Sequence, residues 1–97
     1  MAILDEVLLE EYERMKKMRV VMKAEMDTLP KGYISKKNIY GRQYHYLQRR
    51  EGSKIVSTFI SEKNVAEAEA QIQRRKQLKA SLAEIEESMK KIERVIR

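Results

Sequence analysis

Two apolar stripes with the period of an α-helix dominate the sequence, and a stretch with a different pattern separates them. The first stripe runs from Leu4 to Leu29 in steps of three or four residues, as expected for one face of a helix. Pro30 and Gly32 follow it, and proline both lacks a backbone donor and disfavours the α conformation in the preceding residue. We therefore predict a helix over residues 3–28.

The second stripe begins after the middle stretch and runs to residue 96. Ser61 and Asn64 are both suitable N-cap residues, and Glu62 adds negative charge where the helix dipole favours it. From Leu78 onward the apolar residues recur at steps of four and three, the spacing typical of a coiled coil. The pattern predicts a second helix over residues 62–96.

The stretch between the stripes has the composition of β-strands. It is rich in Tyr, Ile, Val, Thr and Phe, which favour extended backbone. Two short glycine-containing segments, Tyr40-Gly41 and Glu51-Gly52, interrupt it, and each suits a two-residue hairpin loop. We predict that residues 32–60 form a three-stranded antiparallel meander.

The two loops set the register of the meander, and the register sets which residues share a face. The aliphatic face carries Ile34, Lys36, Asn38, Gln43, His45, Leu47, Val56, Thr58 and Ile60. The opposite face, here called the aromatic face, carries Tyr33, Ser35, Lys37, Tyr44, Tyr46, Gln48, Ile55, Ser57 and Phe59, with Arg42 and Arg50 at the ends. This division also holds if the second loop is Gly52-Ser53, because that change shifts the pairing by two residues.

These elements predict an α+β fold that is mostly α. We expect the helices to form an antiparallel, coiled-coil-like hairpin with the meander between them, as one domain over residues 1–97. The apolar stripes are wider than one neighbouring helix covers, and a chain of 97 residues buries only a modest share of its surface. We therefore predict a homodimer that combines the helices of two copies in a four-helix bundle.

The composition argues against an enzyme or a cofactor protein. The chain has no cysteine and one histidine, so disulfides, thiolate chemistry and most zinc or haem sites lack their ligands. His45 has no orienting carboxylate near it in the sequence, and no phosphate-binding loop or nucleophile motif occurs. No apolar run is long enough to cross a membrane, and the first residues are acidic. We expect a cytoplasmic, non-enzymatic protein without a metal, a cofactor or a membrane role.

Positive charge is concentrated in the middle of the chain. The 21 Lys and Arg residues outnumber the 15 Asp and Glu residues, and the formal net charge is +6. Residues 31–60 carry seven basic residues and one acidic residue, a difference of six that equals the net charge of the whole chain. The excess charge therefore lies on the predicted meander.

This distribution favours nucleic-acid binding through the meander. A β-ribbon fits the major groove of DNA, Lys and Arg contact phosphates, and Gln can read an adenine edge. The predicted DNA-binding residues are Lys36, Lys37, Arg42, Tyr44, Tyr46, Gln48, Arg49, Arg50 and Lys54.

Two alternatives to DNA binding stay open. The aromatic residues could be cross-strand packing pairs that the second helix covers, with lysines at strand edges that discourage aggregation. The chain could also be a coiled-coil protein-interaction or assembly module whose basic sheet docks an acidic protein partner.

Three segments of the sequence resemble a known family. They are Leu29-Pro30-Lys31-Gly32, residues 41–52 (GRQYHYLQRREG) and residues 55–60 (IVSTFI). They are similar to a widespread family of small uncharacterised prokaryotic proteins, in which a YYYL-like strand and an REGGK-like turn precede a long charged helix. The resemblance covers residues 28–97, with departures at His45 and Ser53, and it implies no activity because the family has no known function.

A looser similarity is to the arm-site DNA-binding domain of tyrosine recombinases. In that domain a three-stranded sheet enters the major groove, whereas the recombinase catalytic domain has no counterpart in this chain. The similarity implies a sheet that reads DNA, at the level of the fold alone.

Overall fold

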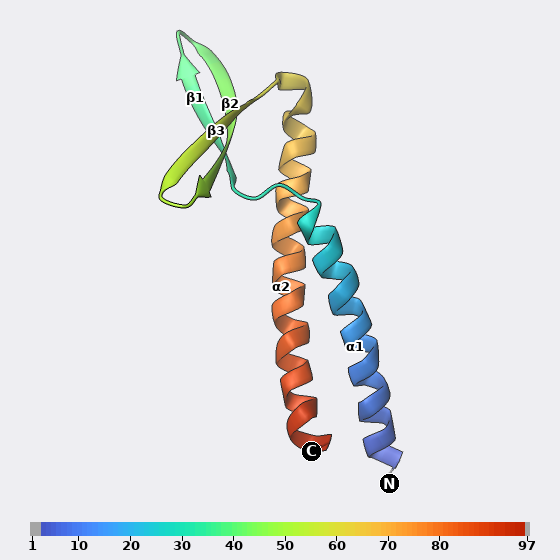
Figure 1. Ribbon diagram of the computed structural model, residues 1–97. Helices are drawn as coiled ribbons and strands as arrows, with labels where there is room; N and C mark the ends of the chain where they lie inside the picture. The colour runs from blue at the N-terminus through green and yellow to red at the C-terminus, as the bar shows by residue number, and fades with distance from the viewer. Residues whose placement is uncertain (1–2, 97) are drawn as a thin grey trace. The chain divides into compact units, whose positions relative to one another are not determined.

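The computed structural model describes residues 3–96 and has a mostly helical α+β fold, as predicted (Figure 1). The elements in chain order are α1 (Ile3–Asp27), β1 (Tyr33–Ile39), β2 (Arg42–Glu51), β3 (Lys54–Ile60), the short 3₁₀ helix η1 (Glu62–Asn64) and α2 (Val65–Ile96). The described chain divides into two compact units. The first unit contains α1 and the part of α2 from Gln77 onward, and the second contains residues 29–76.

In the first unit, polar side chains of α1 contact the second half of α2. The Tyr12 hydroxyl donates a hydrogen bond to Oε1 of Glu93 over 2.6 Å. Nζ of Lys23 lies 4.0 Å from Oε1 of Glu86. These contacts connect the early part of α1 with the end of α2 and the later part of α1 with the middle of α2. A coiled-coil geometry for the helix pair stays a prediction.

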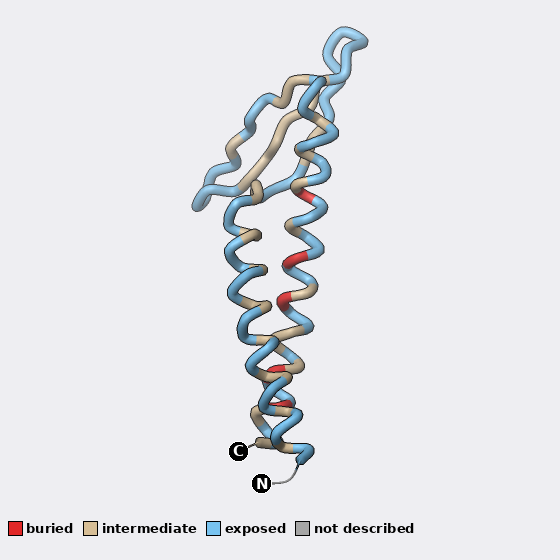
Figure 2. The backbone as a smooth tube through the Cα atoms, turned by 90° about the vertical axis from the view of Figure 1, so that its right-hand side faces the viewer, coloured by how far each residue is buried: buried red, intermediate tan, exposed pale blue. Residues whose placement is uncertain are grey.

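The buried residues of the described chain all lie on α2 (Figure 2). They are Ile72, Leu78, Leu82, Met89 and Ile92. Within Ile3–Asp27, in contrast, α1 has no buried residue. Most of its apolar stripe is half-buried, whereas Ile3, Leu4, Val7, Leu9, Val20 and Val21 are exposed.

The start of α2 differs in detail from the prediction, because residues 62–64 form the 3₁₀ helix η1 and the α-helix starts at Val65. Ser61 has extended backbone but makes no side-chain capping bond. Its hydroxyl instead accepts a hydrogen bond from Nδ2 of Asn64 over 2.9 Å, and its carbonyl accepts one from the Asn64 backbone N–H over 2.9 Å. The two expected N-cap residues thus bind each other. Neither Ser61 alone nor Asn64 alone caps the first turn of the helix.

The sheet of the second unit is antiparallel, with β2 between β1 and β3 (Figure 1). Ile39 pairs with Arg42, so the predicted Tyr40-Gly41 loop between β1 and β2 is confirmed. Both loop residues have positive φ, 50° for Tyr40 and 79° for Gly41, as a type I′ turn requires.

The second loop is Gly52-Ser53, and the prediction of Glu51-Gly52 is wrong by one residue at each end. Glu51 pairs with Lys54, which leaves Gly52 at the first loop position with φ 62°. A type II′ turn needs positive φ at that position, and glycine adopts it more easily than glutamate. Because the pairing shifts by two residues, the division into an aliphatic and an aromatic face stands.

Candidate nucleic-acid interface

The two faces of the sheet differ in how far solvent reaches their apolar side chains. The aliphatic face has half-buried side chains at Ile34, Leu47, Val56 and Ile60. The aromatic face leaves large apolar side chains exposed at Tyr33 (53%), Ile55 (62%) and Phe59 (57%). Tyr44 and Tyr46, in the central strand, are half-buried, so the accessible apolar surface of the aromatic face lies on the two outer strands, at Tyr33, Ile55 and Phe59.

The Phe59 ring contacts two tyrosine rings on the aromatic face. Tyr46 lies opposite Phe59 in the register, and their ring centroids are 5.8 Å apart in an edge-to-face arrangement. The Tyr44 ring lies 6.4 Å from that of Phe59, and Nζ of Lys37 lies 5.0 Å from the Tyr46 ring centroid. The cross-strand packing pairs of the first alternative thus exist, but they do not hide the cluster, since Phe59 stays mostly exposed.

The structure separates the nine predicted DNA-binding residues between the two faces, because side chains alternate along a strand. Six of them share the aromatic face: Lys37, Arg42, Tyr44, Tyr46, Gln48 and Arg50. The other three, Lys36, Arg49 and Lys54, lie on the aliphatic face. One ligand on one side of the sheet therefore meets at most the first group.

The basic residues also differ in how far their charge is neutralised. Nε of Arg49 lies 2.9 Å from Oε1 of Glu51, in an ion pair on the aliphatic face. Arg42 and Arg50 are exposed, and their guanidinium groups make no ion pair with any residue in the range 3–96. The aromatic face thus keeps uncompensated cations at both ends of β2.

Gln48 is held in place by its neighbour on β3. Its Nε2 donates a hydrogen bond to Oγ of Ser57 over 3.2 Å, and the two residues are direct partners in the register. The bond is exposed, and it joins two side chains of the aromatic face. A fixed amide is the kind of group that reads hydrogen-bonding edges of bases.

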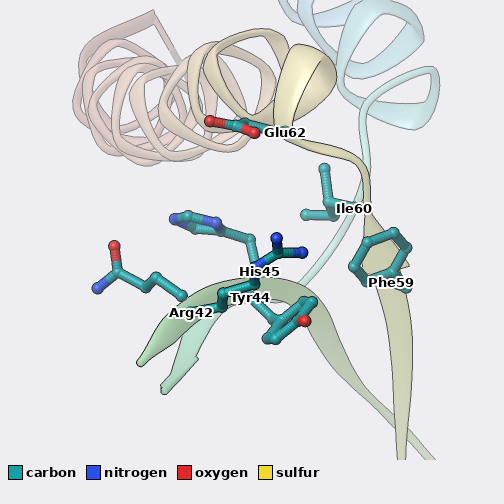
Figure 3. Close-up of a pocket in the computed structure, with 7 residues that line it drawn as sticks. Arg42, Tyr44, His45, Phe59, Ile60 and Glu62 are labelled. Carbon is teal, nitrogen blue, oxygen red and sulfur yellow. The ribbon is translucent and has the colours of Figure 1, made fainter. Parts of the chain in front are cut away.

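A shallow hollow of about 520 Å³ lies where β2 begins and β3 ends. It is lined by Arg42, Gln43, Tyr44, His45, Phe59, Ile60 and Glu62. Figure 3 shows the rings of His45 and Tyr44 on opposite sides of β2, so the lining comes from both faces. Glu62 lines the same hollow, but no hydrogen bond joins it to His45.

Two exposed aromatic residues were not among the predicted binding residues. Phe59 is the third ring of the aromatic cluster, and its position two residues after Ser57 on β3 already indicated its face. Tyr40 forms the tip of the β1–β2 hairpin, is fully exposed (102%) and is the one non-glycine residue with positive φ between residues 3 and 96. The available signal was a tyrosine before Gly41, where a type I′ turn usually has Asn, Asp or Gly.

Other kinds of site find no support in the part of the chain that the structure describes. No group of three or more His, Asp or Glu residues there is arranged to hold a metal ion. None of the described helices combines the length and the apolarity that a membrane crossing demands.

Comparison with known proteins adds a family but no activity. Residues 4–70 match the model of a domain of unknown function, DUF6788. The matched range includes all of α1 except Ile3, the whole sheet and the start of α2, whereas the motif resemblance extended over residues 28–97. None of the curated proteins and none of the solved structures matches the chain, so the similarity to the arm-site domain of tyrosine recombinases is not shown. Since the family model covers well over half of the sequence, the chain belongs to the DUF6788 family, whose function is unknown.

Proposed function

We propose that the chain is a non-enzymatic DNA-binding protein that contacts a duplex with the aromatic face of its sheet. The observation that carries the proposal is the grouping on one face of unpaired cations, aromatic rings and a fixed amide. The binding surface is thereby reduced to Lys37, Arg42, Tyr44, Tyr46, Gln48 and Arg50, with the addition of Phe59.

The dimensions of the sheet suit the major groove. Three strands at about 4.8 Å spacing give a sheet roughly 10 Å across, close to the groove width of about 12 Å. Arg42 and Arg50 are eight residues apart on β2, or about 26 Å at roughly 3.3 Å per residue. Because the groove curves around the duplex, the ends of a strand of this length approach phosphates while its middle faces the base edges.

The residues of the aromatic face divide into those that would contact phosphates and those that would contact bases. Arg42, Arg50 and Lys37 supply the attraction to phosphates that does not depend on sequence. The Gln48 amide has the donor and acceptor that match an adenine edge, and the Phe59 ring offers apolar contact to a thymine methyl group.

A salt titration with a fluorescent duplex tests the proposal. Three cations on the face predict a slope of log K against log salt of about −2.7, at about −0.9 for each neutralised phosphate. Replacing both arginines (Arg42→Glu with Arg50→Glu) should weaken binding and reduce the magnitude of the slope by about 1 for each arginine. The matched control, Lys79→Glu with Lys91→Glu, makes the same change in net charge on the exposed side of α2 and should leave the slope unchanged.

Two results would count against the proposal. One is the absence of binding to mixed-sequence DNA at low salt, and the other is equal weakening by the arginine pair and the lysine pair. If the duplex fails to bind while an acidic polypeptide binds to the same surface, the sheet is a docking site for an acidic protein partner instead.

A second function, assembly through the helices, has its own supporting observation. Large apolar side chains on α1 stay in solvent, including Leu4 (66%), Val20 (67%) and Val21 (67%). An open hollow of about 300 Å³ on this helix is lined by Arg14, Lys17, Met18, Val21 and Met22. We propose that a second copy of the chain covers this surface in a coiled-coil-like bundle, which a measurement of oligomeric state tests.

A further inference from the structure

The tip of the β1–β2 hairpin combines a costly backbone with an exposed aromatic ring. Tyr40 occupies the first loop position with φ 50°, in the left-handed region that disfavours residues with a Cβ atom. Asn or Gly would occupy this position at lower cost. The Tyr40 side chain is fully exposed, so no packing contact within the chain repays that cost.

The surroundings of the tip indicate what Tyr40 contacts. Its neighbour Ile39 is also exposed (42%), so the tip is apolar. Ile39 pairs with Arg42 at the base of the loop, and Lys37, two residues earlier in β1, lies on the same face of the sheet as Ile39. An apolar, flat ring beside cations matches a nucleobase attached to its phosphates, and strained backbone is typically retained where a ligand is contacted.

We propose that Tyr40 stacks on a nucleobase of the bound DNA, at a position where the base is unpaired or easily unstacked. The inference rests on the proposed DNA-binding function and assigns to it a structural preference that the sheet alone does not provide. A two-residue loop places Tyr40 beyond the last paired residues, Ile39 and Arg42. Stacking on a paired base requires prior unstacking, so a bulged base is the preferred target.

The test compares two duplexes of the same sequence, one perfect and one with a single-base bulge, by fluorescence anisotropy. Wild-type protein should prefer the bulged duplex by at least about fivefold, the lower end of what stacking on one base contributes. Tyr40→Asn should bind both duplexes equally and keep the salt slope of the wild type. Tyr40→Phe keeps the ring and should keep the preference.

Thermal unfolding separates loss of contact from loss of fold. Tyr40→Asn creates an Asn-Gly loop, which suits a type I′ turn, so its melting temperature should equal or exceed that of the wild type. Equal affinity of the wild type for both duplexes, or a preference that persists in Tyr40→Asn, overturns the stacking role and leaves the proposed function intact. Absence of salt-dependent binding to either duplex overturns the proposed function itself, and the stacking role with it.

Discussion

Gly32 approaches the backbone of β2 so closely that a side chain does not fit. A Cβ atom at this position would lie 2.1 Å from the Gln48 carbonyl oxygen, and φ is 113°. We expect Gly32→Ala to destabilise the fold by about 2 kcal/mol or more, because both the backbone conformation and the strand contact must change. Urea unfolding followed by circular dichroism measures the loss.

Gly41 provides the control for this substitution. It also has positive φ (79°), but a Cβ atom there would meet nothing within 4 Å. Gly41→Ala should therefore cost only the conformational term, about 1 to 2 kcal/mol. Equal losses for the two variants would show that the contact with Gln48 contributes nothing.

Single residues also show where sequence reasoning ends. Strand alternation was enough to place Tyr44, Tyr46 and Gln48 on one face, because a period of two needs only the loop positions. The ion pair of Arg49 with Glu51 depends on side-chain rotamers, and the approach of Gly32 to Gln48 depends on how the chain enters the sheet. Neither feature has a local pattern, so neither could be predicted.

At the scale of elements, the contact between α1 and α2 includes a hydrogen bond that depends on pH. The Glu93 carboxylate accepts the Tyr12 hydroxyl proton and raises the pKa of Tyr12 above its ordinary value of 10.0, and desolvation raises it further. Because the pKa of Tyr12 is higher in the folded state, the hydrogen bond contributes fully to stability below the pKa that Tyr12 has in the unfolded chain. This contribution is lost as the pH rises through the pKa that Tyr12 has in the folded state. We therefore expect the helix pair to lose stability above about pH 10.

Melting temperatures of wild type and Tyr12→Phe, measured by circular dichroism on both sides of about pH 10, isolate this effect. The phenylalanine variant lacks the hydroxyl, so its melting temperature should fall less than that of the wild type as the pH rises above about 10. Tyr33→Phe serves as the control, since the Tyr33 hydroxyl has no hydrogen-bond partner within residues 3–96. Identical pH profiles for Tyr12→Phe and wild type would contradict the prediction.

The elements themselves were predictable to different degrees. The end of α1 at Asp27 lies one residue before the predicted end, because Pro30 marks it. The start of α2 and the second hairpin loop were less certain, since Ser61 and Asn64 competed as caps and Gly52 could take either loop position. In both places the outcome depended on hydrogen bonds and turn type, which the residue pattern alone does not determine.

At the scale of the whole molecule, we expect two copies of the chain to associate through α1, because no residue within Ile3–Asp27 is buried in the single chain. A second copy that covers Val20 and Val21 removes from water two side chains that are each 67% exposed. We expect light scattering to give twice the mass of one chain, and we expect a melting temperature that rises with protein concentration. Val21→Glu should shift the equilibrium to the monomer, because a carboxylate in an apolar interface is costly to desolvate.

Asn38→Glu adds the same charge to the exposed edge of β1, outside the helices, and should leave the mass unchanged. The pair of variants distinguishes burial of α1 from a general effect of charge. If the wild type is a monomer at all concentrations, the exposed stripe of α1 is not covered by a second copy. If it is a dimer that also persists in Val21→Glu, the copies associate through a different surface, and the four-helix bundle is wrong. Because the sheet and Val21 belong to different compact units, DNA binding by a monomeric Val21→Glu variant should keep its salt slope per chain and lose only the gain in affinity from two linked sheets.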